Sequence, residues 1–411
     1  MNTCTLELTA MAHGGAALGR HEGKVVFVPY ALPGETVRVD LADDQGRFTH
    51  AHLLEVLHPS PDRVPPPCPH FGPHGCGGCH WQHAHYAAQL RYKAEVVADQ
   101  LGRLGGFTDP PVLPTLPDPH GWGYRNQARF HFTSDNEMGF YAAGSDRIVP
   151  LDVCPVLHPT LADLFRALEL DVPGLEALTL RVGVNTGERM VVFEMAEDAP
   201  PGLITDLPIS CVLLLSDGQH VNLVGNNHIL ERASGFTYRI SAPSFFQSNT
   251  AQAEALVDLV MGYLDPQEDE VVLDGYCGVG LFSLPLAEAA GLVIAVESHA
   301  PAVEDLLENS ADMENVQIVE GPVEAVLADL DEPLDAVVVD PPRTGLGRES
   351  VRGIVAAGPA RIVYVSCDPA TLARDAQQLT GAGYRLVEVQ PVDMFPQTYH
   401  VETVSLFAKS P

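Results

Sequence analysis

The sequence predicts a multidomain chain with an N-terminal OB-like β-barrel, an α+β central domain and a C-terminal α/β Rossmann-like domain. Three observations support this fold class. The 411 residues are enough for two or three domains. Short strand-like runs crowd the first 58 residues. Apolar strands alternate with helical stretches from about residue 244 onward. We therefore expect domains at 1–58, 59–243 and 244–411.

The first domain is predicted from several short strands separated by turn residues. Gly14-Gly15 and Pro33-Gly34 interrupt the strand-like runs, and a proline-rich segment over 59–67 follows the last run. Many short strands in so few residues favour a small β-barrel, although another small β-domain would fit the same pattern. The strands are expected at 5–11, 24–30, 36–43 and 49–57.

The central domain is predicted to be mixed. A cysteine-rich loop is followed by helical apolar spacing over about 82–104, and strand-like runs then surround one helix near 159–169. The helix near 82–104 could pack on the C-terminal domain despite its place in the sequence.

The third domain is predicted to contain a seven-stranded, mostly parallel sheet. Helical stretches separate the early strands, which is typical of a parallel sheet with helices on both faces. Only a short loop joins the final two strands, so the last strand should be antiparallel. The strands are expected at 271–273, 292–296, 316–319, 334–339, 362–366, 384–389 and 401–407.

Charge and hydropathy restrict the function and location of the chain. The net charge of −31 argues against nonspecific binding to polyanions. Residues 1–150 carry 11 basic and 15 acidic side chains, so contacts to nucleic acid are easier to place there. The sequence shows neither an apolar run of 18 residues nor a signal-peptide pattern. We expect a cytoplasmic monomer that is not bound to a membrane.

A glycine turn follows the first strand of the predicted sheet. Gly278 and Gly280 open a helix, so a ligand can approach the backbone closely there. The second strand ends in Glu297, whose carboxylate could accept hydrogen bonds from ribose hydroxyls. The turn is GxG and not GxGxxG, which favours S-adenosylmethionine over NAD. A tight turn beside a solvated glutamate is the plain structural alternative.

Two further strands end in residues that can do chemistry. Asp340-Pro341-Pro342-Arg343 forms a rigid, extended loop after one strand. Amino-methyltransferases carry an aromatic residue where this chain has Arg343, so the reaction should not occur at an exocyclic amine. Cys367 follows the strand predicted at 362–366 and reaches the carboxyl edge of the sheet. Its thiol is a candidate nucleophile, although a lone cysteine is more often an inert core residue.

These motifs together resemble the RNA uracil-5-methyltransferases. The resemblance rests on Asp340-Pro341-Pro342-Arg343, Ser366-Cys367-Asp368-Pro369, His400-Val401-Glu402-Thr403 and Ser244-Phe245-Phe246-Gln247-Ser248-Asn249, and the N-terminal segment resembles their TRAM domain. It implies that Cys367 is the nucleophile and Glu402 the base, with Asp340 competing for the second role. It also implies cofactor contacts from Gln247, Tyr276, Glu297 and Asp340, beside the turn at Gly278. Pro322 and Leu281 replace asparagines of some relatives.

The resembled reaction explains why these residue types are needed. A thiolate that adds to uracil C6 makes C5 nucleophilic toward the methyl sulfonium, and a base then removes the C5 proton. The reactive form is the thiolate, so we expect an electropositive environment around Cys367. The target base must be unstacked from the RNA. Phe130, Phe132 and Arg125 are candidates for holding neighbouring bases, and the phenylalanines are equally good candidates for the core.

Four cysteines form a candidate metal site. Cys68, Cys76 and Cys79 lie in one Gly/Pro-rich loop, and Cys154 is the best candidate for a fourth ligand. Spacing leaves zinc and a [4Fe-4S] cluster equally supported. The resemblance implies the cluster and, with it, the 23S ribosomal-RNA branch, because the tRNA branch typically lacks both the cluster and the TRAM-like segment. The alternatives are a tRNA uridine methyltransferase and a non-catalytic RNA-binding or assembly protein.

Overall fold

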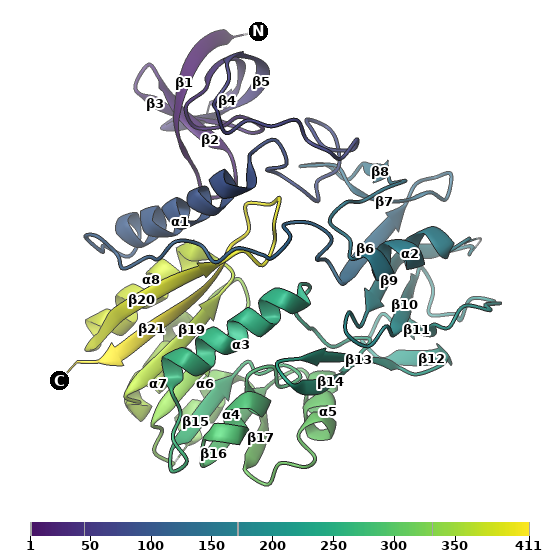
Figure 1. The fold of residues 1–411 in the computed structure, drawn as a ribbon, viewed down its shortest axis with the longest axis vertical. Helices are drawn as coiled ribbons and strands as arrows, with labels where there is room; N and C mark the ends of the chain where they lie inside the picture. The colour runs from purple at the N-terminus through teal and green to yellow at the C-terminus, as the bar shows by residue number, and fades with distance from the viewer. Residues whose placement is uncertain (1, 45, 171, 331, 411) are drawn as a thin grey trace.

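The N-terminal barrel is confirmed and closed. The structure, a computed structural model, describes residues 2–44, 46–170, 172–330 and 332–410. Among them, five strands pair in the order β1-β2-β3-β5-β4, at one end of the molecule (Figure 1). β2 was not predicted, because its five residues include Gly19, Arg20 and His21. The strands are β1 (Thr3–Met11), β2 (Ala17–His21), β3 (Lys24–Val28), β4 (Thr36–Asp44) and β5 (Phe48–His58).

The C-terminal sheet has seven strands, as predicted. Their order is β17-β16-β15-β18-β19-β21-β20, and β21 runs antiparallel to both of its neighbours. The other four pairings are parallel. The strands are β15 (Val271–Gly275), β16 (Leu292–Glu297), β17 (Val316–Glu320), β18 (Ala336–Val339), β19 (Arg361–Ser366), β20 (Tyr384–Val392) and β21 (Glu402–Lys409).

Helices cover both faces of this sheet because its central strands are apolar on both sides. Val338 faces one core and Val337 faces the other, as the alternation of a strand requires. α3 (Thr250–Leu264), α4 (Ser283–Ala289) and α5 (Ala300–Asn309) contribute to the first core. The second core is built from α6 (Val323–Asp329), α7 (Gly347–Ala357) and α8 (Pro369–Gly381).

The central region is a second seven-stranded sheet, ordered β12-β11-β10-β9-β6-β7-β8. All its pairings are antiparallel except that of β10 with β11. α2 (Pro159–Ala167) packs against it. The strands are β6 (Gln127–Phe132), β7 (Met138–Tyr141), β8 (Ile148–Pro150), β9 (Leu175–Val182), β10 (Arg189–Met195), β11 (Ser210–Leu214) and β12 (His220–Val224).

Two segments of the predicted central domain pack on the C-terminal sheet. α1 (Tyr86–Arg103) lies against α8 (Figure 1), and the backbone at Val112 and Leu116 pairs with the edge strand β20. The ribbon of β13 (His228–Ala233) and β14 (Phe236–Ser241) packs on α3 and α5. The domain limits at 58 and 243 stay predictions. No helix in the described part of the chain has the length and apolar character needed to span a membrane.

Candidate active site

The sheet register brings Cys367 and Glu402 together. In the antiparallel pairing of β19 with β21, Ser366 lies opposite Thr403, so the next position places Cys367 opposite Glu402. Thr403 Oγ1 donates to the carbonyl of Ser366 at 3.1 Å and fixes this register locally. Glu402 is buried, whereas Cys367 is partly accessible. The two predicted catalytic residues therefore share one edge of the sheet.

The surroundings of Cys367 are acidic, so the expectation of an electropositive environment is wrong. Burial raises the pKa of the Cys367 thiol to about 12, and the carboxyl groups of Glu402 and Asp340 act in the same direction. Arg343 opposes them but does not outweigh them. The physical reason is that β18 and β21 both deliver carboxylates to the edge where β19 delivers the thiol. In this state Cys367 is a neutral thiol at neutral pH.

Buried carboxyl groups gather along this sheet edge. Burial raises the pKa of Asp274 and of Asp340 to about 7, and it raises the pKa of Glu402 well above its ordinary value. Glu297 and Asp340 add to the shift at Asp274. One Asp274 oxygen accepts from Ser283 Oγ at 2.6 Å, and the other has no hydrogen-bond partner among the described residues. Like charges in a poorly hydrated site repel, so a cationic ligand would be stabilised there.

A cavity of about 450 Å³ lies beside the ends of β15 and β16 and is lined by Tyr276, Glu297 and Pro322. The Glu297 carboxylate accepts from the backbone N–H of Gly278 at 3.0 Å and from that of His299 at 2.7 Å. Tyr276 has a left-handed backbone, with φ of 64°. Pro322, which replaces an asparagine of some relatives, belongs to the wall of this cavity.

The predicted cofactor residues fall into two groups. Tyr276, Gly278 and Glu297 surround the cavity or form its rim. Gln247 and Asp340 do not line the cavity and are joined by a hydrogen bond of 3.4 Å between Gln247 Nε2 and Asp340 Oδ2. Asp340 also interacts electrostatically with Cys367 and Glu402, which places the second group at the thiol end of the site. Their roles toward a cofactor stay predictions.

The central sheet holds Gln247 in place. Asn126 Nδ2 donates to the carbonyl of Gln247 at 3.0 Å. The buried guanidinium of Arg181 donates to the carbonyls of Ser241 and Ser244, both at 2.9 Å. Sequence reasoning missed Asn126 and Arg181, because each lies sixty or more residues before the segment it supports and no local pattern marks it.

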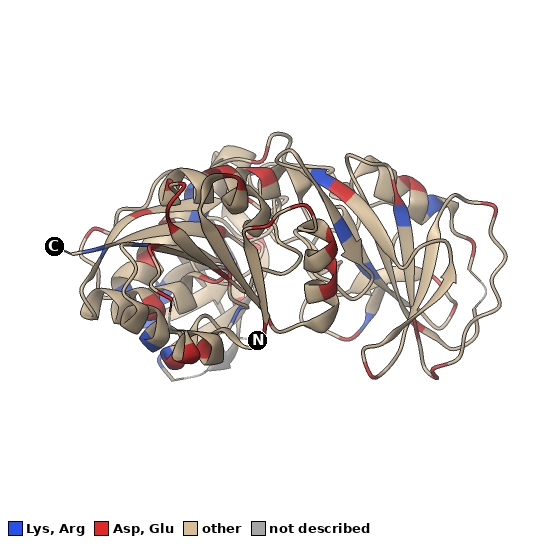
Figure 2. Cartoon of the chain, turned by 90° about the horizontal axis from the view of Figure 1, so that it is seen from below, with Lys and Arg blue, Asp and Glu red and all other residues tan. Residues whose placement is uncertain are grey.

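A larger cleft of about 1230 Å³ opens where the barrel, the cysteine loop, the central sheet and the C-terminal domain meet. Arg125, Arg129 and Arg343 line it, although acidic residues far outnumber basic ones across the chain (Figure 2). Phe245, two residues before Gln247, also lines the cleft and is 66% exposed. Sequence analysis noted Phe245 only as part of a motif. An exposed aromatic ring in a cleft is a surface on which a base can stack.

The prediction that Phe130 might hold a base is wrong. Phe130 is fully buried and stacks on Phe140 and Phe165, with ring centroids 4.9 and 5.0 Å away. Its neighbour Phe132 is partly buried against the same core. Arg125 does line the cleft. The strand alternation of β6 sends the two phenylalanines inward, so both belong to the central core.

The barrel touches the loop that carries the nucleophile. His13 Nε2 lies 3.5 Å from the carboxylate of Asp368, the residue after Cys367. A side chain at Gly15 would come within 2.6 Å of the Tyr399 ring, so only glycine fits there. Trp81 Nε1 donates to the carbonyl of Gly15 at 2.9 Å. The N-terminal barrel thus forms part of the wall around the reactive edge.

The four predicted metal-binding cysteines share one neighbourhood. Burial and the electrostatic influence of the other thiols raise the pKa of Cys79 to about 12 and that of Cys154 to about 11. Cys68 and Cys76 are buried, and none of the four forms a disulfide. Among the described residues, however, no three His, Cys, Asp or Glu side chains are arranged to hold one metal ion. The metal site therefore stays a prediction.

Comparison with known proteins agrees with this geometry. Residues 224–410 match the tRNA (Uracil-5-)-methyltransferase family model, and residues 3–54 match the TRAM domain model. RNA methyltransferases of Gloeobacter violaceus and Streptomyces avermitilis are 39% and 38% identical, covering 99% and 98% of this chain and 97% of each relative.

A solved structure extends the comparison to the whole architecture. The tRNA (uracil-54, C5)-methyltransferase of Pyrococcus abyssi, in complex with S-adenosyl-L-homocysteine, superposes with a TM-score of 0.79 at 28% identity. The match covers 98% of this chain and all of that one. The region of similarity to this tRNA enzyme thus includes the N-terminal barrel. The presence of the barrel therefore does not distinguish a 23S rRNA methyltransferase from a tRNA methyltransferase. From its relatives, its TRAM barrel and its Cys367–Glu402 edge, we conclude that the chain is an enzyme of the RNA (uracil-5-)-methyltransferase family.

Proposed function

We propose that the protein transfers a methyl group from S-adenosylmethionine to C5 of a uridine in RNA, through a covalent bond between Cys367 and uracil C6. The observation that carries this proposal is the pairing of Ser366 with Thr403, which brings the neighbouring residues Cys367 and Glu402 to one sheet edge, where Glu402 and Asp340 act electrostatically on the thiol. An amine-directed enzyme would need neither a nucleophilic thiol nor a second buried acid at this edge.

The acidic edge suits the cofactor. When bound, S-adenosylmethionine supplies an electrophilic methyl group on a positively charged sulfur. The nucleoside would be held by Tyr276, Gly278 and Glu297, and the charged end would lie toward Gln247 and Asp340. Burial raises the pKa of Asp274 most, and the charges of Asp340 and Glu297 add to the shift, so a nearby positive charge would stabilise the ionised carboxyl groups.

The protein's own residues account for the remaining steps. The Cys367 thiol gives up its proton to the Asp340 carboxylate and adds to C6, so that C5 becomes nucleophilic and takes the methyl group, while the carbon–sulfur bond of the sulfonium breaks and leaves a neutral thioether. Glu402 then removes the proton from C5, and the thiolate leaves C6 as the ring double bond re-forms. Glu402 is supported as the base because it lies directly across from Cys367. Asp340 is the competing base.

The proposed RNA is 23S ribosomal RNA, supported by the resemblance that includes the four cysteines. A transfer RNA is the second candidate, favoured by the similarity to the Pyrococcus enzyme. Unmodified transcripts of both should be incubated with the protein and methyl-labelled S-adenosylmethionine, and the nucleosides analysed by mass spectrometry. We expect 5-methyluridine in 23S rRNA. Label confined to tRNA would establish the second candidate, and label in neither would contradict the proposed function.

We also propose that Cys68, Cys76, Cys79 and Cys154 hold a [4Fe-4S] cluster with a structural role. Three buried thiols and the partly buried thiol of Cys154, each of which opposes ionisation of the others, support a shared cationic centre. Thiolates bound to one zinc ion at about 2.3 Å crowd together, whereas those of a cluster bind separate irons. Iron and sulfide analysis of anaerobically purified protein tests this, and one tightly bound colourless zinc would contradict it.

A further inference from the structure

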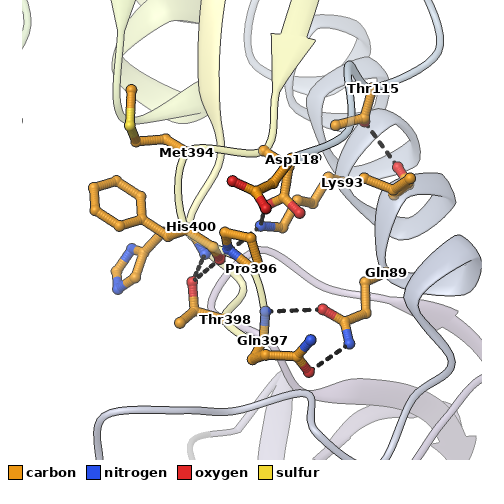
Figure 3. A network of polar contacts seen from close by, with 12 residues as sticks. Gln89, Lys93, Thr115, Asp118, Met394, Pro396, Gln397, Thr398 and His400 are labelled. Atoms are coloured by element: carbon orange, nitrogen blue, oxygen red, sulfur yellow. Dashed lines mark hydrogen bonds and ion pairs between the residues drawn. The ribbon is translucent and has the colours of Figure 1, made fainter. Parts of the chain in front are cut away.

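The loop between β20 and β21, residues 393–401, leads directly into Glu402 and is fastened by two glutamines. Gln397 N donates to Gln89 Oε1 at 3.0 Å, and Gln89 Nε2 donates back to Gln397 Oε1 at 2.9 Å (Figure 3). Both side chains are buried, and they lie 308 residues apart in sequence. This reciprocal amide pair joins α1 to the loop that carries the proposed base.

Gln397 makes further contacts that fully occupy its backbone and side chain. Its carbonyl accepts from the N–H groups of His80 and Trp81, both at 2.9 Å. Its Nε2 donates to the carbonyl of Gly121 at 3.1 Å. Its backbone is left-handed, with φ of 69°, a conformation unusual for a residue other than glycine. Because several buried hydrogen bonds hold Gln397 in this strained conformation, we infer that the position of its loop is important.

The contacts continue from Gln397 toward the reactive edge. His400 N donates to Thr398 Oγ1 at 3.2 Å, and Thr398 Oγ1 donates to the carbonyl of Phe395 at 2.8 Å (Figure 3). Lys93 on α1 anchors the start of the loop through Asp393 and donates to the carbonyl of Phe395 at 3.0 Å. The loop is therefore clamped on both sides of its turn.

We propose that Gln89 and Gln397 are positioning residues for the C5-deprotonation step, because their paired amides hold the 393–401 loop and with it Glu402. The donors at His80 and Trp81 directly follow Cys79, so the pair also links the cysteine loop to the base. Both partners are neutral amides, so the clamp keeps its geometry at every pH at which the nearby carboxyl groups titrate.

This inference rests on the proposed function and predicts a defect in one step. Gln397→Gly accepts the left-handed backbone but loses both side-chain bonds, and Gln89→Ala removes the partner. We expect adducts with 5-fluorouridine RNA to form within about twofold of the wild-type rate, because Cys367 is untouched. Turnover on ordinary RNA should fall at least about tenfold, with the covalent protein–RNA complex accumulating, because a displaced base removes the proton slowly.

Gln100→Ala is the matched control. Gln100 lies on the same helix and is also buried, but its side chain donates to Asp99 and not to the loop. This variant should behave as wild type. If Gln397→Gly does not fold, Gln397→Asn takes its place in the test, because asparagine tolerates a left-handed backbone and keeps an amide. The ratio of adduct formation to release is measured within one protein, so it does not depend on the folded fraction.

The outcomes separate the inference from the function on which it rests. Wild-type protein that forms no adduct would overturn both. If the wild-type protein forms the adduct and the Gln397 variants release their covalent RNA complex at the wild-type rate, the inference alone is overturned. Equal losses in formation and release would also overturn it, because that is the signature of general destabilisation.

Discussion

The cofactor-side cavity and the interdomain cleft differ sharply in charge and in chain origin. The cavity is enclosed by strand ends and helices of one sheet, and buried carboxyls lie close to it. The cleft is lined by four separate parts of the chain and contains Arg125, Arg129 and Arg343. Pro342 lines the cavity and the next residue, Arg343, lines the cleft and acts electrostatically on Cys367 and Glu402.

This contrast explains how so acidic a chain can act on RNA. A positively charged cofactor benefits from buried carboxylates, whereas a polyanion needs local cations and stacking surfaces. The net charge of −31 describes the chain as a whole, and the arginines of the cleft form a local exception. On the proposed function, the cofactor and the RNA would therefore meet opposite electrostatic environments.

The largest expected effect is at the edge between the two environments. Glu402→Gln should lower turnover by about 10²- to 10⁴-fold, because the C5 proton loses its acceptor. The covalent complex should accumulate on ordinary RNA and be visible by denaturing electrophoresis. Asp340→Asn is the comparison variant. If it accumulates the complex and Glu402→Gln does not, the base is Asp340.

An effect confined to the cleft should follow from Phe245→Ala. Losing a stacking surface should weaken RNA binding by about 1–3 kcal/mol, measured by fluorescence anisotropy at constant salt. The binding of S-adenosylmethionine and the melting temperature should not change. The control is Phe48→Ala, because Phe48 is an exposed aromatic residue that does not line the cleft. Weakened cofactor binding with intact RNA binding would show that the two regions are assigned the wrong way round.

The smallest expected effect is on cofactor affinity. Burial raises the pKa of Asp274 and Asp340 to about 7, so both are mostly neutral at pH 6 and mostly charged at pH 8. A cationic ligand prefers the charged forms, so affinity should rise by up to about tenfold over this range, with proton release seen in calorimetry. Asp340→Asn should flatten the profile, and affinity that falls with rising pH would contradict the account.

The same shifts predict how the unliganded protein responds to pH. A carboxyl group whose pKa is higher in the folded state than in the unfolded chain contributes stability that is fully present below the unfolded-state pKa. This contribution is lost as the pH rises through the folded-state pKa. The free energy of unfolding contributed by Asp274 and Asp340 should therefore begin to fall near pH 4 and continue to fall through about pH 7. Thermal melts of the unliganded protein test this, and S-adenosylmethionine should oppose the loss.

The C-terminal sheet could be predicted because its signals are local. Each strand is a short apolar run, and the residues at its end, such as Asp340 and Cys367, lie at the sheet edge by topology alone. The barrel was predicted without β2, whose glycine and polar residues do not resemble a strand. There the close approach of Gly19 to the carbonyl of Glu7 requires glycine, and tertiary pairing outweighs local propensity.

Features that depend on distant contacts could not be predicted. The acidic surroundings of Cys367 arise from strands that are adjacent in space and not in sequence, so the sequence pattern suggested the wrong sign. The burial of Phe130 depends on α2 packing against β6 and β9. The pairing of Gln89 with Gln397 has no local signal at all.

The most direct test of the central claim is to trap the protein on RNA that contains 5-fluorouridine. The fluorine cannot leave as a proton, so the bond between the protein and uracil C6 should persist and be located by peptide mass spectrometry. We predict one modified residue, Cys367, and loss of the adduct in Cys367→Ala but not in Cys211→Ala, a buried cysteine of the central sheet. An adduct that forms on Cys277, or that survives in Cys367→Ala, would contradict the account.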